Sequence, residues 1–564
     1  MSLASILCDL LLFFGLVFGL GLPWVVSSRL DSAEKLAVGA AIGVVQIFGF
    51  AWVVYCAGLP GMTFLALPAL AMASLGLRWR ALSGFFSDSP VQGLSGRQLL
   101  FTAWCVGWLA LVRSYGGGEW SADWHEHYQR TLFFLDRQPL ETLFLDTYRL
   151  PARPPLANLV TGAGLALTDT NFAHFQLFST FFSTLLFLPA VLLARHFARG
   201  RGGGDATLLL MLMLSPFVLQ NATFAWTKLL TAFFILVAVA CYVRGLAQND
   251  ATRRTIAVGA MAAALLTHYS AGPYAAGLAI AQIVLLWSRR KERPMWRELV
   301  LQAGLTAVLL ATWVAWSLVH YGAHTTFLSN TTATVGTGLS TGAWLSRRIG
   351  NAFVTLIPHP LRLTDYRFIA QTSPLGFVRD YCFTIYQTTL PGAFGSAGLL
   401  LLAWCGLHRR SPTQGPAERQ FWRWFPAGVL LLSVATASWP DRWGFAHIYL
   451  PALVVMGLAL VAARLGDMPA GIRRCWMAAL ALDWVRGIVL HFYLQATIRV
   501  PPNAFTDLMQ GKTFEYGLVT TKNLLFKLVC GYTFVADGNL APGLVVAFLL
   551  MLGILAGKQA LRAR

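Results

Sequence analysis

Long apolar runs recur from one end of the sequence to the other, and they constrain its fold more than any other feature. The runs have about 17 to 24 residues, enough for a helix to cross the hydrocarbon core of a bilayer. Only 12% of the residues are charged and 56% are hydrophobic, so such surfaces need a lipid environment. We therefore predict an all-α fold, a polytopic transmembrane helical bundle of about 15 spans.

Lysine and arginine gather in alternate short loops, as in Arg78 to Arg80, Arg253 to Arg254 and Arg289 to Arg297. The positive-inside rule assigns these loops to the cytoplasm. The formal charge of +19 therefore indicates topology, and we expect no nucleic-acid partner. Three longer loops fall on the exoplasmic side and are expected to carry short amphipathic helices: 115–173, 321–390 and 497–540.

The first long loop holds the densest group of ionisable residues in the chain. A short helix from Ser121 to Leu135 would place Asp123, Glu126 and His127 on one side, since residues three and four apart are neighbours. Trp124 and other aromatic residues suggest that this helix lies on the membrane surface.

Three interpretations of these side chains stay open. Asp123 or Glu126 could be a general base, because partial desolvation raises the pKa of a carboxyl group. The helix could instead be a solvated surface element whose acids pair with His127 and Arg130. A metal site of Asp123, Glu126 and His127 is possible geometrically, but we predict neither a metal nor a cofactor.

Arg153 precedes Pro154 and Pro155, and Tyr148 and Arg149 lie just upstream. Proline fixes its own backbone and restricts the residue before it. A guanidinium on so stiff a backbone suits a phosphate, because its planar donors can reach two oxygens at once. The alternative is a rigid connection into the next helix.

Isolated polar residues also occur at the predicted exoplasmic ends of later spans: Lys228, His268, Arg442 and His447. Such residues are costly near a membrane and tend to mark sites, although each alone could be snorkelling or a satisfied histidine. Asp483 and Arg486, one helical turn apart inside a span, are predicted to form an ion pair with each other.

These motifs resemble the GT-C superfamily of integral-membrane glycosyltransferases, in particular bacterial relatives of protein O-mannosyltransferases and aminoarabinose transferases. The resemblance lies in an acidic motif soon after a span, Asp123 to His127, and in Arg153-Pro154-Pro155-Leu156 downstream. It implies a GT-C-like core at 98–464, additional N-terminal helices at 1–97 and C-terminal helices at 465–564.

The resemblance also implies a function. The donor would be a sugar on a polyprenyl phosphate, Asp123 or Glu126 would act as base on an acceptor hydroxyl, and Arg153 would bind near the phosphate. Lys228, His127, His268, Arg442, His447, Tyr148 and Arg149 complete the expected substrate site. The membrane would be a bacterial inner membrane with the site on its exoplasmic face, and lipid would be a second partner.

Two other classes of function are considered. A transporter or flippase would line a path with the same span-end residues, but it usually has two related halves and a site at mid-membrane. A glycan polymerase or ligase would use similar lipid-linked substrates with different loops. The position of the polar residues on one face favours the transferase.

Overall fold

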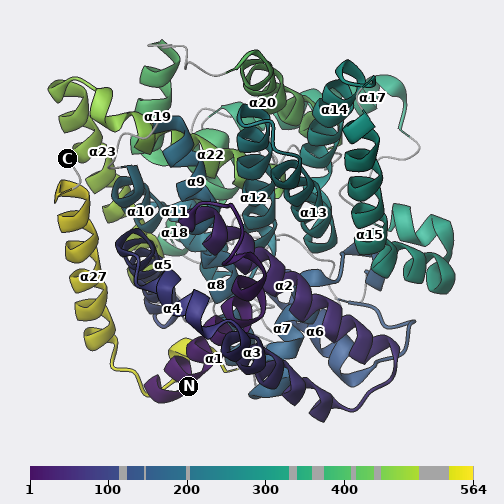
Figure 1. The fold of residues 1–564 in the computed structure, drawn as a ribbon. Coiled ribbons are helices and arrows are strands. Elements are labelled where there is room, and N and C mark those ends of the chain that lie inside the picture. Colours follow the sequence, from purple (N-terminus) through teal and green to yellow (C-terminus); the bar gives the residue numbers. More distant parts are fainter. Residues whose placement is uncertain are drawn as a thin grey trace.

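The computed structural model describes residues 1–112, 123–144, 148–198, 204–291, 293–329, 339–357, 374–407, 415–436, 446–494 and 533–562. These ranges are helical, without a β-strand, and contain one isolated β-bridge between Phe144 and Tyr148. Figure 1 shows the helices packed side by side into one bundle. The all-α, polytopic membrane fold is therefore confirmed.

The first half of the chain leads to a deeply buried helix, α12. Its elements are α1 (Leu3–Val25), α2 (Ser32–Cys56), η1 (Gly61–Leu65), α3 (Ala66–Leu77), α4 (Trp79–Phe86), α5 (Ser89–Leu109), α6 (Asp123–Asp136), η3 (Leu150–Ala152), α7 (Leu156–Leu167), α8 (Phe172–Thr184), α9 (Phe187–Ala198), α10 (Gly204–Leu214), α11 (Pro216–Thr223) and α12 (Lys228–Ala247).

The second half packs around it. Its elements are α13 (Ala251–Thr267), η4 (Tyr269–Ala271), α14 (Gly272–Ser288), α15 (Arg293–Leu328), α17 (Thr341–Leu356), α18 (Pro374–Thr388), α19 (Leu390–Leu407), α20 (Pro416–Thr436), α21 (Ala446–Tyr449), α22 (Pro451–Arg464), η7 (Leu465–Asp467), α23 (Ala470–Ile488), η8 (Val489–Leu494), η9 (Val535–Asp537) and α27 (Pro542–Arg562).

The lengths of the apolar runs predicted about 15 membrane spans, but fewer helices are suited to cross a membrane. In the part of the chain that is described, eight are long and apolar enough, or up to ten if each sharply bent pair counts as one span. One such pair, α10 and α11, bends by 67° where Pro216 starts the second helix. Proline and glycine breaks of this kind divided runs that looked continuous in the sequence.

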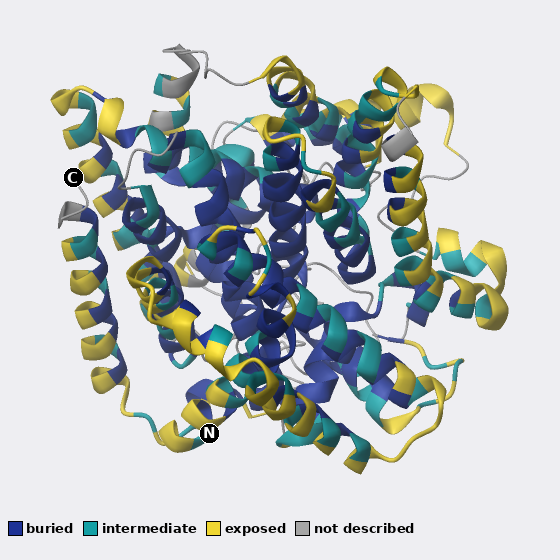
Figure 2. Cartoon of the chain, in the orientation of Figure 1, coloured by how far each residue is buried: buried dark blue, intermediate teal, exposed yellow. Residues whose placement is uncertain are grey.

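Burial separates a central helix from peripheral ones. The apolar window of α12 is 89% buried, whereas those of α15 and α27 are 11% and 22% buried. In Figures 1 and 2, α12 runs through the dark-blue middle while α27 and α15 lie on opposite flanks. A helix that is apolar all round belongs in such a core, and α12 carries Lys228 at its start.

The expected surface helix of the first long loop is the main correction. The side chains of Trp124, Glu126 and Arg130 in α6 are fully buried, and Phe133 is buried against Phe144. The loop also contains α7, whose residues are buried almost throughout. Helices α6 and α7 are thus largely inside the bundle, where Glu126 is paired with Arg130 and Arg153.

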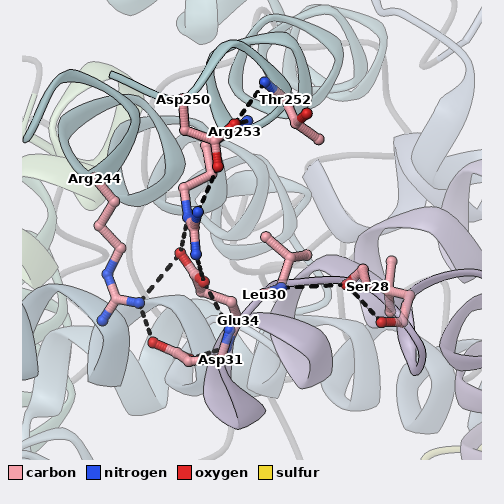
Figure 3. A network of polar contacts seen from close by, with 9 residues as sticks. Ser28, Leu30, Asp31, Glu34, Arg244, Asp250, Thr252 and Arg253 are labelled. Atoms are coloured by element: carbon pink, nitrogen blue, oxygen red, sulfur yellow. Dashed lines mark hydrogen bonds and ion pairs between the residues drawn. The ribbon is translucent and has the colours of Figure 1, made fainter. Parts of the chain in front are cut away.

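Near the start of α2, a buried ionic network ties the N-terminal helices to the core (Figure 3). Asp31 caps α2 in a capping box with Glu34, whose side chain is fully buried. One oxygen of Glu34 lies 2.7 Å from Arg253 of α13 and the other 3.1 Å from Arg244 of α12. Removing the carboxylate would leave two arginines without this counter-ion.

We expect Glu34→Ala to destabilise the protein by about 3–5 kcal/mol, the range for breaking one side of a buried ion pair. The measurement is the unfolding midpoint of the detergent-purified protein. Glu141→Ala, which removes an exposed carboxylate, is the matched control and should change little. Equal midpoints for the two variants would contradict a stabilising role for the network.

Candidate functional site

Helix α6 supplies the acidic centre of the site. Its sequence from Asp123 to Arg130 places Glu126 and Arg130 four residues apart, so their side chains meet on one face. Arg130 donates from Nε to Glu126 Oε1 at 2.9 Å, and its Nη2 lies 2.8 Å from the same oxygen. Both side chains have no exposed surface.

Arg130 also fixes the segment that leads to Arg153. Its Nη1 donates to the carbonyl of Leu150 at 2.7 Å and its Nη2 to that of Arg149 at 3.1 Å. Directly after this short η3 turn, Arg153 extends its Nη2 to 3.6 Å from Glu126 Oε2. One carboxylate therefore lies between two arginines from segments distant in sequence.

Two tyrosine rings and a lysine extend the cluster toward the ends of the spans. The Arg153 guanidinium lies 5.4 Å from the ring centre of Tyr269 and 5.7 Å from that of Tyr148. Lys228 Nζ lies 5.8 Å from the same Tyr269 ring and 3.0 Å from His268 Nε2. Because α12 begins at Lys228, these cations gather where the spans end.

The charges of these groups follow from burial and from one another. Burial alone would raise the pKa of Glu126, but the charges of Arg153 and Arg130 outweigh it and lower the pKa to about 2. Burial lowers the pKa of His127 to about 3; the charge of Glu126 opposes this shift, while those of Arg153, Arg130 and Lys228 add to it. At neutral pH Glu126 is therefore ionised and His127 is neutral.

Most of the residues predicted from the sequence come together here. Glu126, Arg153, Lys228, His268 and Tyr148 all lie in the cluster. Next to Glu126 in sequence, His127 lies within electrostatic range of the same cations. The exposed side chain of Arg149 has no part in the contacts described, and only its carbonyl contributes.

Three predicted residues fall outside what is described. The backbone of Asp123 starts α6, but its side chain lies outside the described residues. Arg442 lies outside them entirely. The backbone of His447 belongs to α21, where Tyr449 packs 6.3 Å from Tyr269, but the His447 side chain is not described. Their roles stay predictions.

Sequence reasoning left two contributors out of the expected site. The position of Arg130, one helical turn after Glu126, could have indicated its role, but it was considered only as the partner of an acid on a solvated surface helix. Tyr269 carried only its position next to His268. No local pattern indicated that its ring would lie between Arg153 and Lys228.

Among the described side chains, no group of three or more histidine, cysteine, aspartate or glutamate residues is placed to hold a metal ion. Of the two acids considered as metal ligands, Glu126 is paired with two arginines, and the side chain of Asp123 is not described.

No family model and no curated protein sequence matches the chain. Among solved structures, ArnT from Cupriavidus metallidurans bound to undecaprenyl phosphate aligns with a TM-score of 0.43 and 14% identity, covering 83% of this chain and 78% of that one. Its apo state gives 0.44 and 15%, covering 83% and 77%. The likeness concerns the overall fold alone and assigns no activity or site residue.

The buried neutral ring of His127 makes stability depend on pH. The unfolded chain binds a proton at this ring below its ordinary pKa of 6.5, whereas the folded protein does so only near 3. The free energy of unfolding should therefore fall as pH drops below about 6.5, and Glu126 adds to the fall only below its ordinary pKa of 4.5.

The measurement is the unfolding midpoint between about pH 5 and 8. His127→Gln should flatten the dependence, whereas His324→Gln, which replaces an exposed ring, should keep the wild-type slope. An unchanged slope in His127→Gln would contradict a neutral buried ring.

Proposed function

We propose that the protein is a membrane glycosyltransferase that moves a sugar from a polyprenyl-phosphate donor to an acceptor hydroxyl at the exoplasmic face. The observation that carries the proposal is a cationic cluster at the ends of the spans, in which Arg130 and Arg153 pair with Glu126 and Lys228 lies near the same Tyr269 ring as Arg153. A phosphate on a lipid reaches a membrane protein at this level.

The balance of charge favours a phosphate that gains charge during the reaction. Two arginines pair with the single carboxylate of Glu126, and Lys228 lies near the same Tyr269 ring as Arg153, so the described residues of the cluster carry a net positive charge. A sugar-linked polyprenyl phosphate carries one negative charge, and the phosphate released by transfer carries up to two. Cations arranged in advance therefore stabilise the departing group more than the donor, as catalysis requires.

Asp123 is the proposed base, and Glu126 the proposed positioning residue. With its oxygens facing Arg130 and Arg153, Glu126 stays ionised and is a weak proton acceptor. Asp123 begins α6 one turn earlier, on the same side of the helix. It would take the proton of the acceptor hydroxyl as that oxygen bonds to the anomeric carbon. The bond from that carbon to the phosphate oxygen breaks, and polyprenyl phosphate leaves near Arg153 and Lys228.

Each remaining side chain has a defined place in this scheme. Arg153 and Lys228 would contact the phosphate, and Tyr148 and Tyr269 would hold the Arg153 guanidinium between their rings. His268 would orient Lys228 through the 3.0 Å contact. Arg442 and His447 are proposed to approach from the segment that contains α21. The membrane is proposed to be a bacterial inner membrane.

The test is transfer of labelled sugar from a polyprenyl-phosphate donor pool to endogenous acceptors, in membranes with matched expression. Asp123→Asn should lose about a hundredfold or more, the size expected for a general base. Arg153→Ala should lose about 10²- to 10³-fold, as for loss of a group that stabilises a developing anion.

Arg149→Ala is the matched control, since it removes an arginine four residues away whose side chain is exposed. It should retain wild-type transfer. Full activity in both Asp123→Asn and Arg153→Ala would refute the assigned site, and absence of transfer by the wild type from every polyprenyl-phosphate sugar would refute the function.

A further inference from the structure

A small cavity adjoins His127, and its wall is made by α6, α7, α8, α12 and the turn before α12. It is lined by His127 of α6, Asn158 and Thr161 of α7, Ser179 of α8, Thr227 before α12 and Ala225, together with apolar side chains. The described lining contains no aspartate, glutamate, lysine or arginine, and His127 is neutral at neutral pH. The polar groups of the cavity wall are therefore uncharged.

Two of these wall residues hold polar atoms that lack a hydrogen-bond partner among the described residues. They are His127 Nδ1 and Thr227 Oγ1, and the side chains are 4% and 7% exposed. Buried polar atoms are normally bonded, and one left without a partner costs free energy. Two such atoms on one cavity indicate a ligand group that bonds them.

The backbone beside Thr227 is also unusual. Ala225 has a φ of 59°, a left-handed conformation that costs a non-glycine residue energy. Thr227 occupies the N-cap position of α12 in a helical conformation, and its hydroxyl makes no cap bond to the helix. Threonine at this position usually bonds the helix N-terminus. Here its hydroxyl is left in the cavity wall.

Size and charge define what the cavity can take. The space inside it that the centre of a water-sized group can occupy is about 20 Å³, and a cavity needs about 10–15 Å³ of such space to hold one water. A single hydroxyl fits, whereas a whole sugar ring does not. Burial at His127 disfavours any charged group, and the three cations Arg153, Arg130 and Lys228 outnumber the one opposing charge of Glu126, so an uncharged group fits there better than an ammonium.

We infer that this cavity is a specificity subsite for one uncharged hydroxyl of the donor sugar, bound by His127 and Thr227. The inference rests on the proposed function, because the sugar adjoins the phosphate held by Arg153 and Lys228. The neutral imidazole and the threonine hydroxyl can each donate or accept, so they match a group that does both. The protein then selects a hydroxyl-bearing sugar over one with hydrogen or an amine at that position.

The experiment measures transfer by the full-length protein in membranes from synthetic polyprenyl phosphates that carry glucose, mannose or galactose. The sugar that is transferred is then tested in forms with each hydroxyl in turn replaced by hydrogen or by an amine. At one position of the sugar, replacing the hydroxyl should lower kcat/KM by about 10⁴-fold, as expected for a site built to bond a hydroxyl. At that position the protein should reject both the donor with hydrogen and the donor with an amine.

Thr227→Val should narrow that discrimination about tenfold, the worth of one hydrogen bond, while Thr227→Ser, which keeps the hydroxyl, should retain it. Equal use of all the deoxy donors overturns the subsite but leaves the transferase intact, and this result needs no variant to fold. The subsite is also overturned if the protein prefers the amine donor, or if Thr227→Val discriminates between the hydroxyl and deoxy donors as strongly as the wild type. Absence of transfer from every donor overturns the subsite and the proposed function together.

Discussion

The site depends on the pairing of Glu126 with Arg130 and Arg153. A buried carboxylate or guanidinium is costly unless it is paired and hydrogen-bonded, so none of the three could occupy this position alone. Together they allow a charged helix, α6, to lie inside the bundle. The spare donors of Arg130 bind the carbonyls of Arg149 and Leu150 and so fix the turn that presents Arg153. The same contacts that make α6 a buried helix arrange the cations in advance.

A single rigid element connects this cluster to the opposite end of the bundle. Helix α12 begins with Lys228 at the candidate site and carries Arg244 in its last turn, beside Glu34 and Asp31. It is also the helix whose apolar window is 89% buried, against 39% for α1 and 67% for α2. A functional group on so well packed a helix is held more precisely than one on a loop. The network around Glu34 therefore contributes to the site indirectly, by holding α2 and α13 against α12.

Much of the fold followed from hydrophobic runs, but contacts across the sequence did not. The pairing of Asp483 with Arg486 was predictable from their spacing and is present at 3.4 Å. Asp483 also accepts from the backbone of Ser396 and Ala397, just past Gly395, where α19 kinks, and no local pattern indicated this. The burial of α6 was missed for the same reason. Its charges look solvated until Arg153, 27 residues after Glu126, is placed beside them. Residue types thus indicated the candidate site, whereas pairing between distant segments determined its geometry.

The most direct measurement is an experimental structure of the full-length protein with a polyprenyl phosphate bound. A phosphate at the proposed position would lie within hydrogen-bonding distance of both Arg153 and Lys228, with Glu126 still paired to Arg130. A phosphate bound elsewhere on the protein, with no contact to either cation, would contradict the account. So would displacement of Glu126 from its arginines on binding, since the carboxylate would then be free to act as the base.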